Sequence, residues 1–469
     1  MDVSLGVVGL GTMGANLARN AAKRKAAVAV FNRTKEKTDV FMTQHAAEGT
    51  FTACATYDEL IAALKPPRAI LIMVSAGKAV DDVIDELTPK LSPGDIVIDG
   101  GNSHYSDTER RCSSMAERGF RFLGLGVSGG ELGALNGPSL MPGGDASAYK
   151  HVEPLLRAMA APDGTGDACV EYLGPGGAGH FVKMVHNGIE YALMQIIAEC
   201  YDVLRSLAEF SSDQIAETFQ SWSSAHDLSS YLLEVSAAVL RKKEGSRFLI
   251  DLIKDVAEQK GTGKWTTIAA LEYGVAIPTI TAGVDARILS GASALRKAGK
   301  DFPVTLDLTE PMPKADKLRS FVRASYDLSA VCAYHQGFEL IAAASEHHGW
   351  KIPVSSCARL WRAGCIIRSA QLPLWQAAYS TEEVTRSGAW RAILGKFMAG
   401  TETDWRLLPQ LTASRGLPTF AISASLNYFD TLHREKLPQN LIQAQRDYFG
   451  AHTFERTDKT GTFHADWAK

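Results

Sequence analysis

The stretch VSLGVVGLGTMGANLARNAAKRKAAVAVF, residues 3–31, decides the fold of the first part of the chain. It begins with an apolar, β-prone run, continues through Gly9, Gly11 and Gly14, and ends with a helical pattern and a second strand pattern. Glycines at this spacing permit a tight turn and let a pyrophosphate approach the helix N-terminus, where free N–H groups and the helix dipole favour anions. A glycine turn without a ligand is the alternative. Strand, turn, helix and strand in this order nevertheless predict a dinucleotide site.

The end of this second strand indicates which dinucleotide the site prefers. An NAD-preferring site usually carries Asp or Glu there to hold the ribose 2′-hydroxyl. This sequence instead has Asn32, Arg33 and Thr34, followed by Lys35 and Lys37. With no carboxylate to repel a 2′-phosphate, Arg33 could grip it. The alternative is that Arg33 is a surface arginine at the start of a helix. We expect NADP in preference to NAD.

Further strand signals extend the sheet at residues 69–74, 96–99 and 120–126, and they alternate with helical patterns. This alternation is typical of a parallel sheet covered by helices on both faces. Two glycine-rich loops, residues 99–103 and 126–130, follow strands. Ligands of open α/β sheets sit beyond the carboxyl ends of the strands, so Asn102 and the turn at 128–130 could present donors to an anionic substrate. Either loop alone is more often only a turn.

A second informative stretch is GPGGAGHFVKMVHNGIEYALM, residues 174–194. At 100° per residue, one side of the predicted helix carries Lys183, His186, Asn187, Glu190, Tyr191 and Met194, and the opposite side carries Val182, Val185, Ile189, Ala192 and Ile196. An ordinary amphipathic helix with its polar side in water is the alternative. The varied polar side chains and the glycines at its start argue against that alternative. Lys183 and Glu190 lie about 10 Å apart along the axis, too far to pair directly, so they could act on one bound molecule.

The sequence from residue 180 to about 435 is rich in helical periodicity and poor in strand signals, which predicts a mostly helical second domain. The turn at 260–264, Lys-Gly-Thr-Gly-Lys, suits an anion, although a solvated turn is the commoner outcome for such a segment alone. Arg287 stands in a small, apolar stretch. For residues 361–369, Trp-Arg-Ala-Gly-Cys-Ile-Ile-Arg-Ser, we prefer helix packing to a functional role.

The C-terminal tail begins beyond Leu437, with a short helix predicted at 440–448 and little periodicity after it. Such a tail cannot form a core of its own, so we expect another surface to order it. Arg446, His452 and Arg456 give it a cationic face.

Length, charge and cysteine content set outer bounds on the function. A chain of 469 residues is too long for one ordinary core and predicts two or three domains. Its formal net charge of −3 predicts no general attraction to nucleic acid or anionic membranes. Seven scattered cysteines show no metal-ligand spacing and are typical of free thiols in a reducing compartment. A strand predicted from Val3 leaves no room for a signal peptide, and no apolar run reaches the roughly 18 residues of a membrane span. We expect a cytoplasmic protein.

With these motifs in place, the sequence resembles the 6-phosphogluconate dehydrogenase family, the decarboxylating NADP enzymes of the pentose phosphate pathway. The matching motifs span essentially the whole chain, at residues 9–14, 31–34, 126–131, 179–191, 260–265 and 443–452. The resemblance implies an α/β, Rossmann-like first domain at 1–176, a large all-α domain at 177–436 and an extended C-terminal tail at 437–469. It also implies a homodimer in which the tail penetrates the partner subunit and shares the active site.

The resemblance further assigns residues by position. It makes Lys183 the general base and Glu190 the general acid, with no metal. Around the sugar phosphate it places Asn102, Ser128, Gly129, Gly130, His186, Asn187, Tyr191, Lys260, Thr262 and Arg287, with Arg446 and His452 reaching in from the neighbouring subunit. Around the cofactor it places Gly9, Leu10, Gly11, Thr12, Met13, Gly14, Asn32, Arg33, Thr34, Val74, Ser75, Ala76 and Asn102. Two positions depart from the family pattern, because Gly11 replaces a common Ala and Ser75 replaces a common Lys, with Lys78 three residues on.

The chemistry that the resemblance implies is oxidation of 6-phosphogluconate followed by decarboxylation. Lys183 would take the proton of the C3 hydroxyl as hydride passes to NADP. The resulting 3-keto acid would lose CO₂, and Glu190 would protonate C1 of the enediol to give ribulose 5-phosphate. A lysine base must be neutral, so its pKa must fall below the ordinary value of about 10.4, and burial and the nearby cation Lys260 are candidate causes. The cations for the phosphate would be Lys260, Arg287, Arg446 and His452.

Two alternatives belong to other classes of protein. The short β-hydroxyacid dehydrogenases share the glycine turn and the Lys-x-x-x-Asn helix, but about 170 residues beyond a usual two-domain size and the cationic set argue against them. A nucleotide-sensing or structural protein could also keep the fold, since fold does not fix function. The intact pair of Lys183 and Glu190 favours an enzyme.

Overall fold

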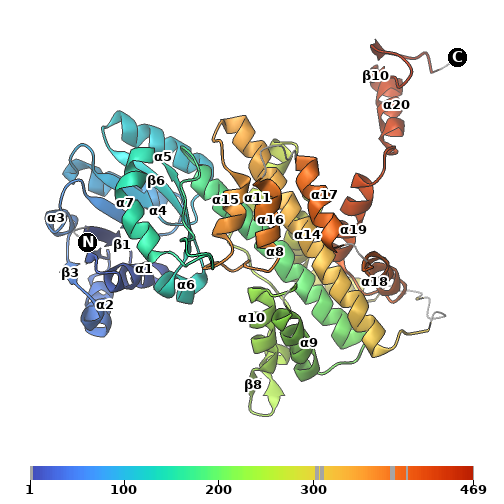
Figure 1. The fold of residues 1–469 in the computed structure, drawn as a ribbon, viewed down its shortest axis with the longest axis horizontal. Helices are drawn as coiled ribbons and strands as arrows, with labels where there is room; N and C mark the ends of the chain where they lie inside the picture. The colour runs from blue at the N-terminus through green and yellow to red at the C-terminus, as the bar shows by residue number, and fades with distance from the viewer. Residues whose placement is uncertain are drawn as a thin grey trace.

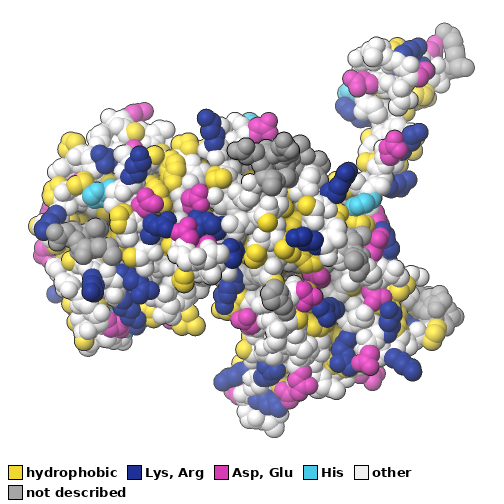
Figure 2. Space-filling model, viewed as in Figure 1, with side chains coloured by type: hydrophobic (Ala, Val, Ile, Leu, Met, Phe, Trp, Pro, Cys, Tyr) yellow, Lys and Arg dark blue, Asp and Glu magenta, His cyan; other side chains and the backbone are white. Residues whose placement is uncertain are grey.

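The computed structural model describes residues 4–225, 227–301, 306, 311–380, 386–397 and 400–467. Figure 1 shows an α/β part that contains the N-terminus, a helical part beside it, and a C-terminal arm that projects away from the helices. Over the face drawn in Figure 2, Lys and Arg side chains intermingle with Asp and Glu, in agreement with the small net charge of −3. Within the described residues, no helix combines the length and the apolarity needed to cross a membrane.

The α/β part is built on a sheet whose described strands follow the order β3-β2-β1-β4-β5-β6-β7. The strands are β1 (Ser4–Val8), β2 (Ala27–Phe31), β3 (Phe51–Cys54), β4 (Ala69–Ile72), β5 (Ile96–Asp99), β6 (Arg121–Ser128) and β7 (Ser139–Gly144). Strands β1 to β6 are parallel, as the alternating signals predicted, and β7 runs antiparallel to β6. The helices that accompany the sheet are α1 (Thr12–Lys23), α2 (Lys35–His45), α3 (Tyr57–Ala62), α4 (Lys78–Leu87), α5 (Tyr105–Glu117), α6 (Gly130–Asn136) and α7 (Ala146–Met159).

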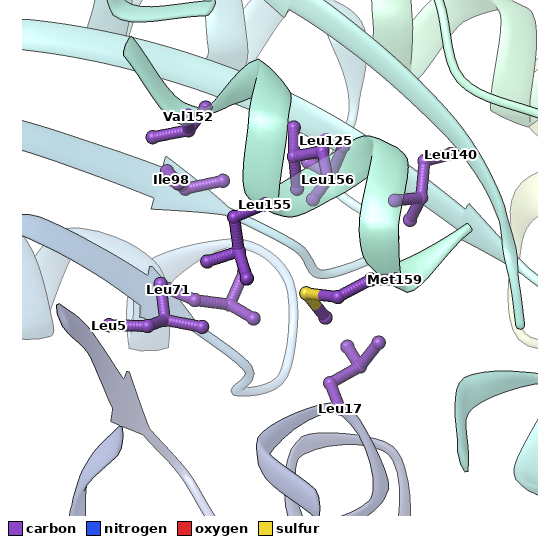
Figure 3. A pocket seen from close by; sticks show the side chains of 10 residues that line it. All are labelled: Leu5, Leu17, Leu71, Ile98, Leu125, Leu140, Val152, Leu155, Leu156 and Met159. Carbon is purple, nitrogen blue, oxygen red and sulfur yellow. The ribbon is translucent and has the colours of Figure 1, made fainter. Parts of the chain in front are cut away.

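Each face of the sheet has its own apolar core, because successive strand residues point to opposite faces. Leu71 packs in one cluster with Leu17 of α1 and Leu156 of α7, whereas its neighbour Ile70 packs in another with Leu60 of α3. Figure 3 shows a small pocket in the first core, where side chains from strands β1, β4, β5, β6 and β7 meet α1 and α7. Its lining residues are all apolar, so it is a packing gap and not a site for a polar ligand.

The second part is helical, as predicted. Its helices are α8 (Ala178–Ser206), α9 (Ser212–Ser224), α10 (Tyr231–Arg241), α11 (Thr262–Glu272), α12 (Pro278–Gly291), α13 (Ser293–Gly299), α14 (Ala315–His348), α15 (Val354–Leu360), α16 (Leu372–Tyr379), α17 (Arg386–Phe397), α18 (Glu402–Ser414) and α19 (Phe420–Leu432), with a hairpin of β8 (Lys243–Glu244) and β9 (Arg247–Phe248). The long helices α8 and α14 lie side by side (Figure 1). Gly337 of α14 permits this approach, since a Cβ there would stand 2.4 Å from Ile189 Cδ1 of α8.

Helix α8 joins the two parts, because its first turn packs directly on the sheet. A Cβ on Gly179 would stand 2.3 Å from the carbonyl oxygen of Met141 in β7, so the glycines before and within this turn make room for strand backbone. Further along, the buried Glu199 accepts hydrogen bonds from the backbone N–H groups of Ala421 (2.8 Å) and Ile422 (3.0 Å) in the first turn of α19. A carboxyl group thus satisfies free N–H groups of another helix within the core.

The C-terminal arm consists of α20 (Gln439–Gly450) and a hairpin of β10 (Phe454–Glu455) and β11 (Thr462–Phe463) (Figure 1). The predicted helix is confirmed. The arm also has internal hydrogen bonds that the sequence did not indicate, because the carboxylate of Asp447 is fully buried within it and ties its helix to the hairpin. That another surface orders the tail stays a prediction.

Candidate active site

Lys183 lies in a buried part of α8, against strand β6. Gly126 of that strand makes the room, since a Cβ there would stand 2.5 Å from Lys183 Cβ. Lys183 is 6% exposed and His186 is fully buried, so the polar side of α8 faces protein and not water. The predicted buried face is confirmed over this stretch, although Met194 at its far end is 43% exposed.

The polar groups of this face form one hydrogen-bonded cluster. Lys183 Nζ donates to Asn187 Oδ1 at 2.8 Å and lies 3.4 Å from His186 Nδ1. The other ring nitrogen of His186, Nε2, is 3.0 Å from the hydroxyl of Ser128 at the end of β6. The structure therefore brings together four residues that the sequence placed at one site, and it holds the amine by its neighbours on α8.

Burial shifts the protonation of the three ionisable groups on this face. It lowers the pKa of Lys183 to about 8, against the opposing effects of the Glu190 carboxylate and the Cys365 thiol. Burial also raises the pKa of Glu190, although Lys183 and Arg287 act in the other direction. The pKa of His186 falls well below its ordinary value, because of burial first and of Lys183 second. Burial therefore shifts the amine toward its neutral form and the Glu190 carboxyl toward its protonated form, the forms that general base and general acid catalysis require.

Lys260 does not contribute to the lowered pKa of Lys183, contrary to the expectation. It is exposed, one residue before the start of the turn at Gly261, and the cause of the shift is burial within α8 and its neighbours. A cation this exposed is screened by solvent. Lys260 remains a candidate for the phosphate only.

Helix α11 packs closely on α8 beside the cluster. A Cβ on Gly263 would stand 2.6 Å from the ring of Tyr191, and Thr262, the first residue of α11, is buried. From α12, the guanidinium of Arg287 lies 3.5 Å from the centre of the Tyr191 ring and donates to the carbonyl oxygen of Glu258 at 3.2 Å. Tyr191, Thr262 and Arg287 are thus neighbours, as the predicted substrate set requires.

The turn at 128–130 is shaped by glycines and by a loop from the helical part. Gly129 and Gly130 have φ values of +124° and +62°, which side chains rarely adopt. A Cβ on Gly129 would also stand 2.6 Å from the carbonyl oxygen of Gly364, which accepts a hydrogen bond from Ser139 N at 2.8 Å. Residues 361–369 therefore form a loop against the candidate substrate turn and not a packed helix as expected. Helix α15 already ends at Leu360, and Gly364 within the loop has a positive φ of +64°.

This loop also carries site neighbours that the sequence interpretation missed. The Trp361 ring lies edge-on to the His186 ring, with 5.6 Å between the ring centres, and the Cys365 thiol acts on the pKa of Lys183. Both side chains are fully buried. An aromatic residue and a cysteine are ordinary core residues, so their type gave no signal of this position.

A buried arginine links the two loops at the ends of β4 and β5. Arg111 of α5 is 2% exposed and donates to Asp99 Oδ2 at 3.2 Å and to the carbonyl oxygen of Gly77 at 3.0 Å. It therefore connects the loop of Asn102 to the loop of residues 74–76. The sequence interpretation missed this residue as well, because an arginine within a helical pattern usually faces solvent.

The glycine turn has the geometry that a dinucleotide site needs. Gly9 has a φ of +99°, and a Cβ on Gly14 would stand 2.0 Å from the carbonyl oxygen of Gly9. Asn32 Oδ1 accepts a hydrogen bond from Leu10 N at 3.0 Å and so holds the turn against the end of β2. Apart from Gly11 itself and its two chain neighbours, no described residue has an atom within 4 Å of the position that a Cβ of Gly11 would take. The turn is thus closely packed except where a ligand would approach.

The other predicted cofactor residues lie at the same edge of the sheet and face solvent. Arg33 follows β2 and is exposed, and Ser75 and Ala76 follow β4 and are exposed. Lys78, three residues beyond Ser75, forms an ion pair with Asp82 on α4. Both side chains of this pair are exposed, so it holds Lys78 only weakly along its own helix.

Arg446 and His452 do not join the site within one chain. Both are exposed on the projecting arm, where Arg446 donates to Gln443 Oε1 at 3.0 Å (Figure 1). In the described part of the chain, no group of three or more His, Cys, Asp or Glu side chains could hold a metal ion.

The parallel sheet with its glycine turn, together with the buried lysine and the half-buried carboxyl of α8, defines a dehydrogenase of the dinucleotide-binding class. Two family models match the chain. The NAD binding domain of 6-phosphogluconate dehydrogenase matches residues 4–174, and the C-terminal domain of 6-phosphogluconate dehydrogenase matches residues 179–467. The chain belongs to the 6-phosphogluconate dehydrogenase family.

Individual relatives agree over the full length. A decarboxylating 6-phosphogluconate dehydrogenase of Synechococcus elongatus is 46% identical over 466 residues, 98% of each chain. One of Staphylococcus aureus is 45% identical over 477 residues, covering 100% of this chain and 99% of its own. The solved 6-phosphogluconate dehydrogenase of Plasmodium falciparum, described with its cofactor NADP⁺ and its substrate 6-phosphogluconate, has a TM-score of 0.93 at 37% identity and full coverage of both chains. The predicted family and fold class are confirmed.

Proposed function

We propose that this protein oxidises 6-phospho-D-gluconate with NADP and releases CO₂ and D-ribulose 5-phosphate, as an enzyme of the pentose phosphate pathway. The observation that carries the proposal is the pair on α8. Lys183 is a buried amine whose pKa falls to about 8, and Glu190 is a carboxyl whose pKa is raised. The full-length relatives named for this reaction support the same function. The unpaired cysteines suit a reducing compartment, which we take to be the cytoplasm.

NADP fits the residues present at the glycine turn. The open space at Gly11 lies beside the N-terminus of α1, whose free N–H groups suit a pyrophosphate. Arg33 is exposed at the end of β2, where the sequence has no carboxylate to repel a 2′-phosphate. Residues 9–14, 32–34 and 74–76, with Asn102, would hold the cofactor. When bound, NADP accepts a hydride from the substrate.

Lys183 performs the first proton transfer in this proposal. Oxidation at C3 of the substrate requires loss of the hydroxyl proton, and a neutral amine can accept it. Asn187 and His186 hold the amine in place, and His186 stays neutral because its pKa is so low. The 3-keto acid that forms then loses CO₂, because its carbonyl accepts the electrons of the breaking C1–C2 bond.

Glu190 performs the last proton transfer. The enediol left by decarboxylation must be protonated at the carbon that becomes C1 of ribulose 5-phosphate. A carboxyl can donate that proton only if it is protonated, and burial favours this state. Lys183 donates its hydrogen bond to Asn187 and not to Glu190. Lys183 can therefore accept a proton, and Glu190 can donate one, independently of each other.

We further propose that the enzyme is a homodimer with domains at 1–176, 177–436 and 437–469. The projecting arm supports this, because its apolar side chains Leu441, Ile442, Tyr448 and Phe449 are 54–72% exposed and require a covering surface. The same arm carries Arg446 and His452, which one chain does not bring to its own site (Figure 1). A twofold dimer would supply both cations to the partner's phosphate site. The remaining substrate contacts would come from Asn102, Ser128, Gly129, Gly130, His186, Asn187, Tyr191, Lys260, Thr262 and Arg287.

The test measures NADPH and CO₂ in one reaction, with 6-phosphogluconate as substrate and 3-hydroxyisobutyrate as the control. We expect equal amounts of NADPH and CO₂ with the first and neither product with the second. NADPH without CO₂ would contradict decarboxylation, and activity with 3-hydroxyisobutyrate alone would assign a β-hydroxyacid dehydrogenase activity.

A further inference from the structure

The C-terminal arm contains a carboxylate that is buried although the arm itself is exposed. Asp447 is fully buried, and its two oxygens accept hydrogen bonds from four donors, one in the turn after α20 and three in the segment after β11. The donors are Thr453 N (2.8 Å), His464 Nδ1 (2.9 Å), Ala465 N (3.1 Å) and Trp467 Nε1 (2.8 Å). Burial opposes ionisation of this carboxyl, but these hydrogen bonds outweigh it and hold its pKa well below the usual range.

The position of Asp447 in α20 does not explain why a carboxylate stands there. It lies in the last turn of the helix, where the helix dipole disfavours a negative charge. Its carboxylate instead accepts a hydrogen bond from the chain that follows the helix. Ala451 and Thr453 have φ values of +49° and +61°, which cost energy for residues with a side chain. The bond from Thr453 N to Asp447 compensates for this strained path.

That path determines where His452 points. His452 lies between the two left-handed residues, and its ring is packed so closely that a Cβ on Gly450 would stand 2.7 Å from its Cδ2. Gln443 Nε2 donates to the carbonyl oxygen of Thr453 at 2.6 Å, while Gln443 Oε1 accepts from Arg446 at 3.0 Å. One glutamine therefore connects the backbone beside His452 to the Arg446 guanidinium. Arg446 and the turn that carries His452 are thus linked within the arm.

We propose that Asp447 is a positioning residue for the substrate phosphate. Its buried carboxylate fixes the turn at 451–453, and it thereby sets Arg446 and His452 in place before the phosphate arrives. A preorganised pair binds more tightly because less conformational freedom is lost on binding. The inference rests on the proposed function, in which Arg446 and His452 of one subunit bind the phosphate in the partner's site.

The test substitutes Asp447→Asn in the full-length protein and compares it with Asp458→Asn. Both residues are on the arm, but Asp458 is exposed and pairs only with Arg456 among its described ion pairs. Asparagine keeps the shape of Asp447 but loses the charge and the ability to accept at both ends. We expect Asp447→Asn to raise KM for 6-phosphogluconate about tenfold or more, with kcat and KM for NADP within about twofold of wild type. Asp458→Asn should change none of these values.

A double-mutant cycle separates positioning from a general loss of stability. If Asp447 acts through the two cations, Asp447→Asn should add little to KM for 6-phosphogluconate in the Arg446→Ala/His452→Ala background. Equal losses in both backgrounds, or a parallel rise in KM for NADP, would overturn the inference. The inference would also be overturned if Arg446→Ala/His452→Ala raised KM for 6-phosphogluconate but Asp447→Asn left it unchanged. In that case the proposal of a shared site would still hold. An unchanged KM in Arg446→Ala/His452→Ala would instead overturn the shared site, and the role of Asp447 with it.

Discussion

Asn187→Asp is a direct test of Lys183 as the base. Asn187 Oδ1 lies 2.8 Å from Lys183 Nζ, so the substitution places a carboxylate against the amine with almost no change in shape. Two unit charges at that distance attract by roughly 6 kcal/mol at an effective dielectric constant of about 20. That energy corresponds to about 4 pKa units. If half of this attraction is realised in the protein, the pKa of Lys183 rises from about 8 to about 10.

The sign of the effect follows from the need for a neutral amine. At pH 7 an amine with a pKa of about 8 is neutral in roughly one molecule in ten, and one with a pKa of about 10 in roughly one in a thousand. We therefore expect kcat/KM for 6-phosphogluconate at pH 7 to fall about a hundredfold, and the rising limb of its pH profile to move up by about 2 units. The assay is kcat/KM at saturating NADP over a pH series from about 6 to 10, which follows groups of the enzyme before 6-phosphogluconate binds.

Asn187→Ala is the control, because it removes the contact without adding a charge. It should lower activity at every pH, since Asn187 is also a candidate substrate contact. Its rising limb should nevertheless stay at or below the wild-type pH, because an acceptor that favours the charged amine has been lost. A rising limb of Asn187→Asp at the wild-type position would refute Lys183 as the titrating base.

Three further predictions concern the cofactor, the acid and the dimer. Arg33→Asp should raise KM for NADP far more than KM for NAD, and an unchanged ratio of kcat/KM for the two cofactors would remove Arg33 from the 2′-phosphate site. Glu190→Gln should slow solvent deuterium incorporation at C1 of ribulose 5-phosphate more than it slows hydride transfer, whereas full-rate, stereospecific incorporation would mean that another group is the acid. At a 6-phosphogluconate concentration far below the raised KM of Arg446→Ala, the Lys183→Ala and Arg446→Ala homodimers should each be nearly inactive, but random exchange of their subunits makes about half the dimers mixed, each with one intact site, so roughly a quarter of wild-type activity should return. Mixed dimers seen by mass spectrometry without that recovery would show that the arm serves its own subunit.

Local patterns in the sequence were sufficient to predict the fold and much of the candidate site. The strand, the glycine turn and the helix around Gly9 follow one another within about 30 residues, and each has a signal of its own. The polar face of α8 repeats at helical spacing, so Lys183 and Glu190 could be placed on one wall without knowledge of the rest of the chain. The mixed polar residues of this face predicted that it is buried, and Lys183 is indeed buried.

The features that sequence analysis missed depend on contacts between distant residues. The Gly364 loop touches Gly129, which lies far from it in the sequence, and Arg111 joins loops that follow two different strands. A positive φ at Gly364 and a buried arginine give no periodic signal. The role of Asp447 in the arm was missed for a similar reason, because its carboxylate joins residues that lie apart in the sequence, such as Thr453 and Trp467.

In the proposed mechanism, the buried amine of Lys183 begins both oxidation and decarboxylation. The most direct measurement is NADPH and CO₂ formed in parallel by the wild-type protein and by Lys183→Met, which fills a similar buried volume without the amine. NADP binding serves as the control for folding. We expect one CO₂ for each NADPH in the wild type, and a fall of both products together by about 10²- to 10⁴-fold in the variant. A Lys183→Met protein that forms NADPH at close to the wild-type rate would contradict the proposed mechanism.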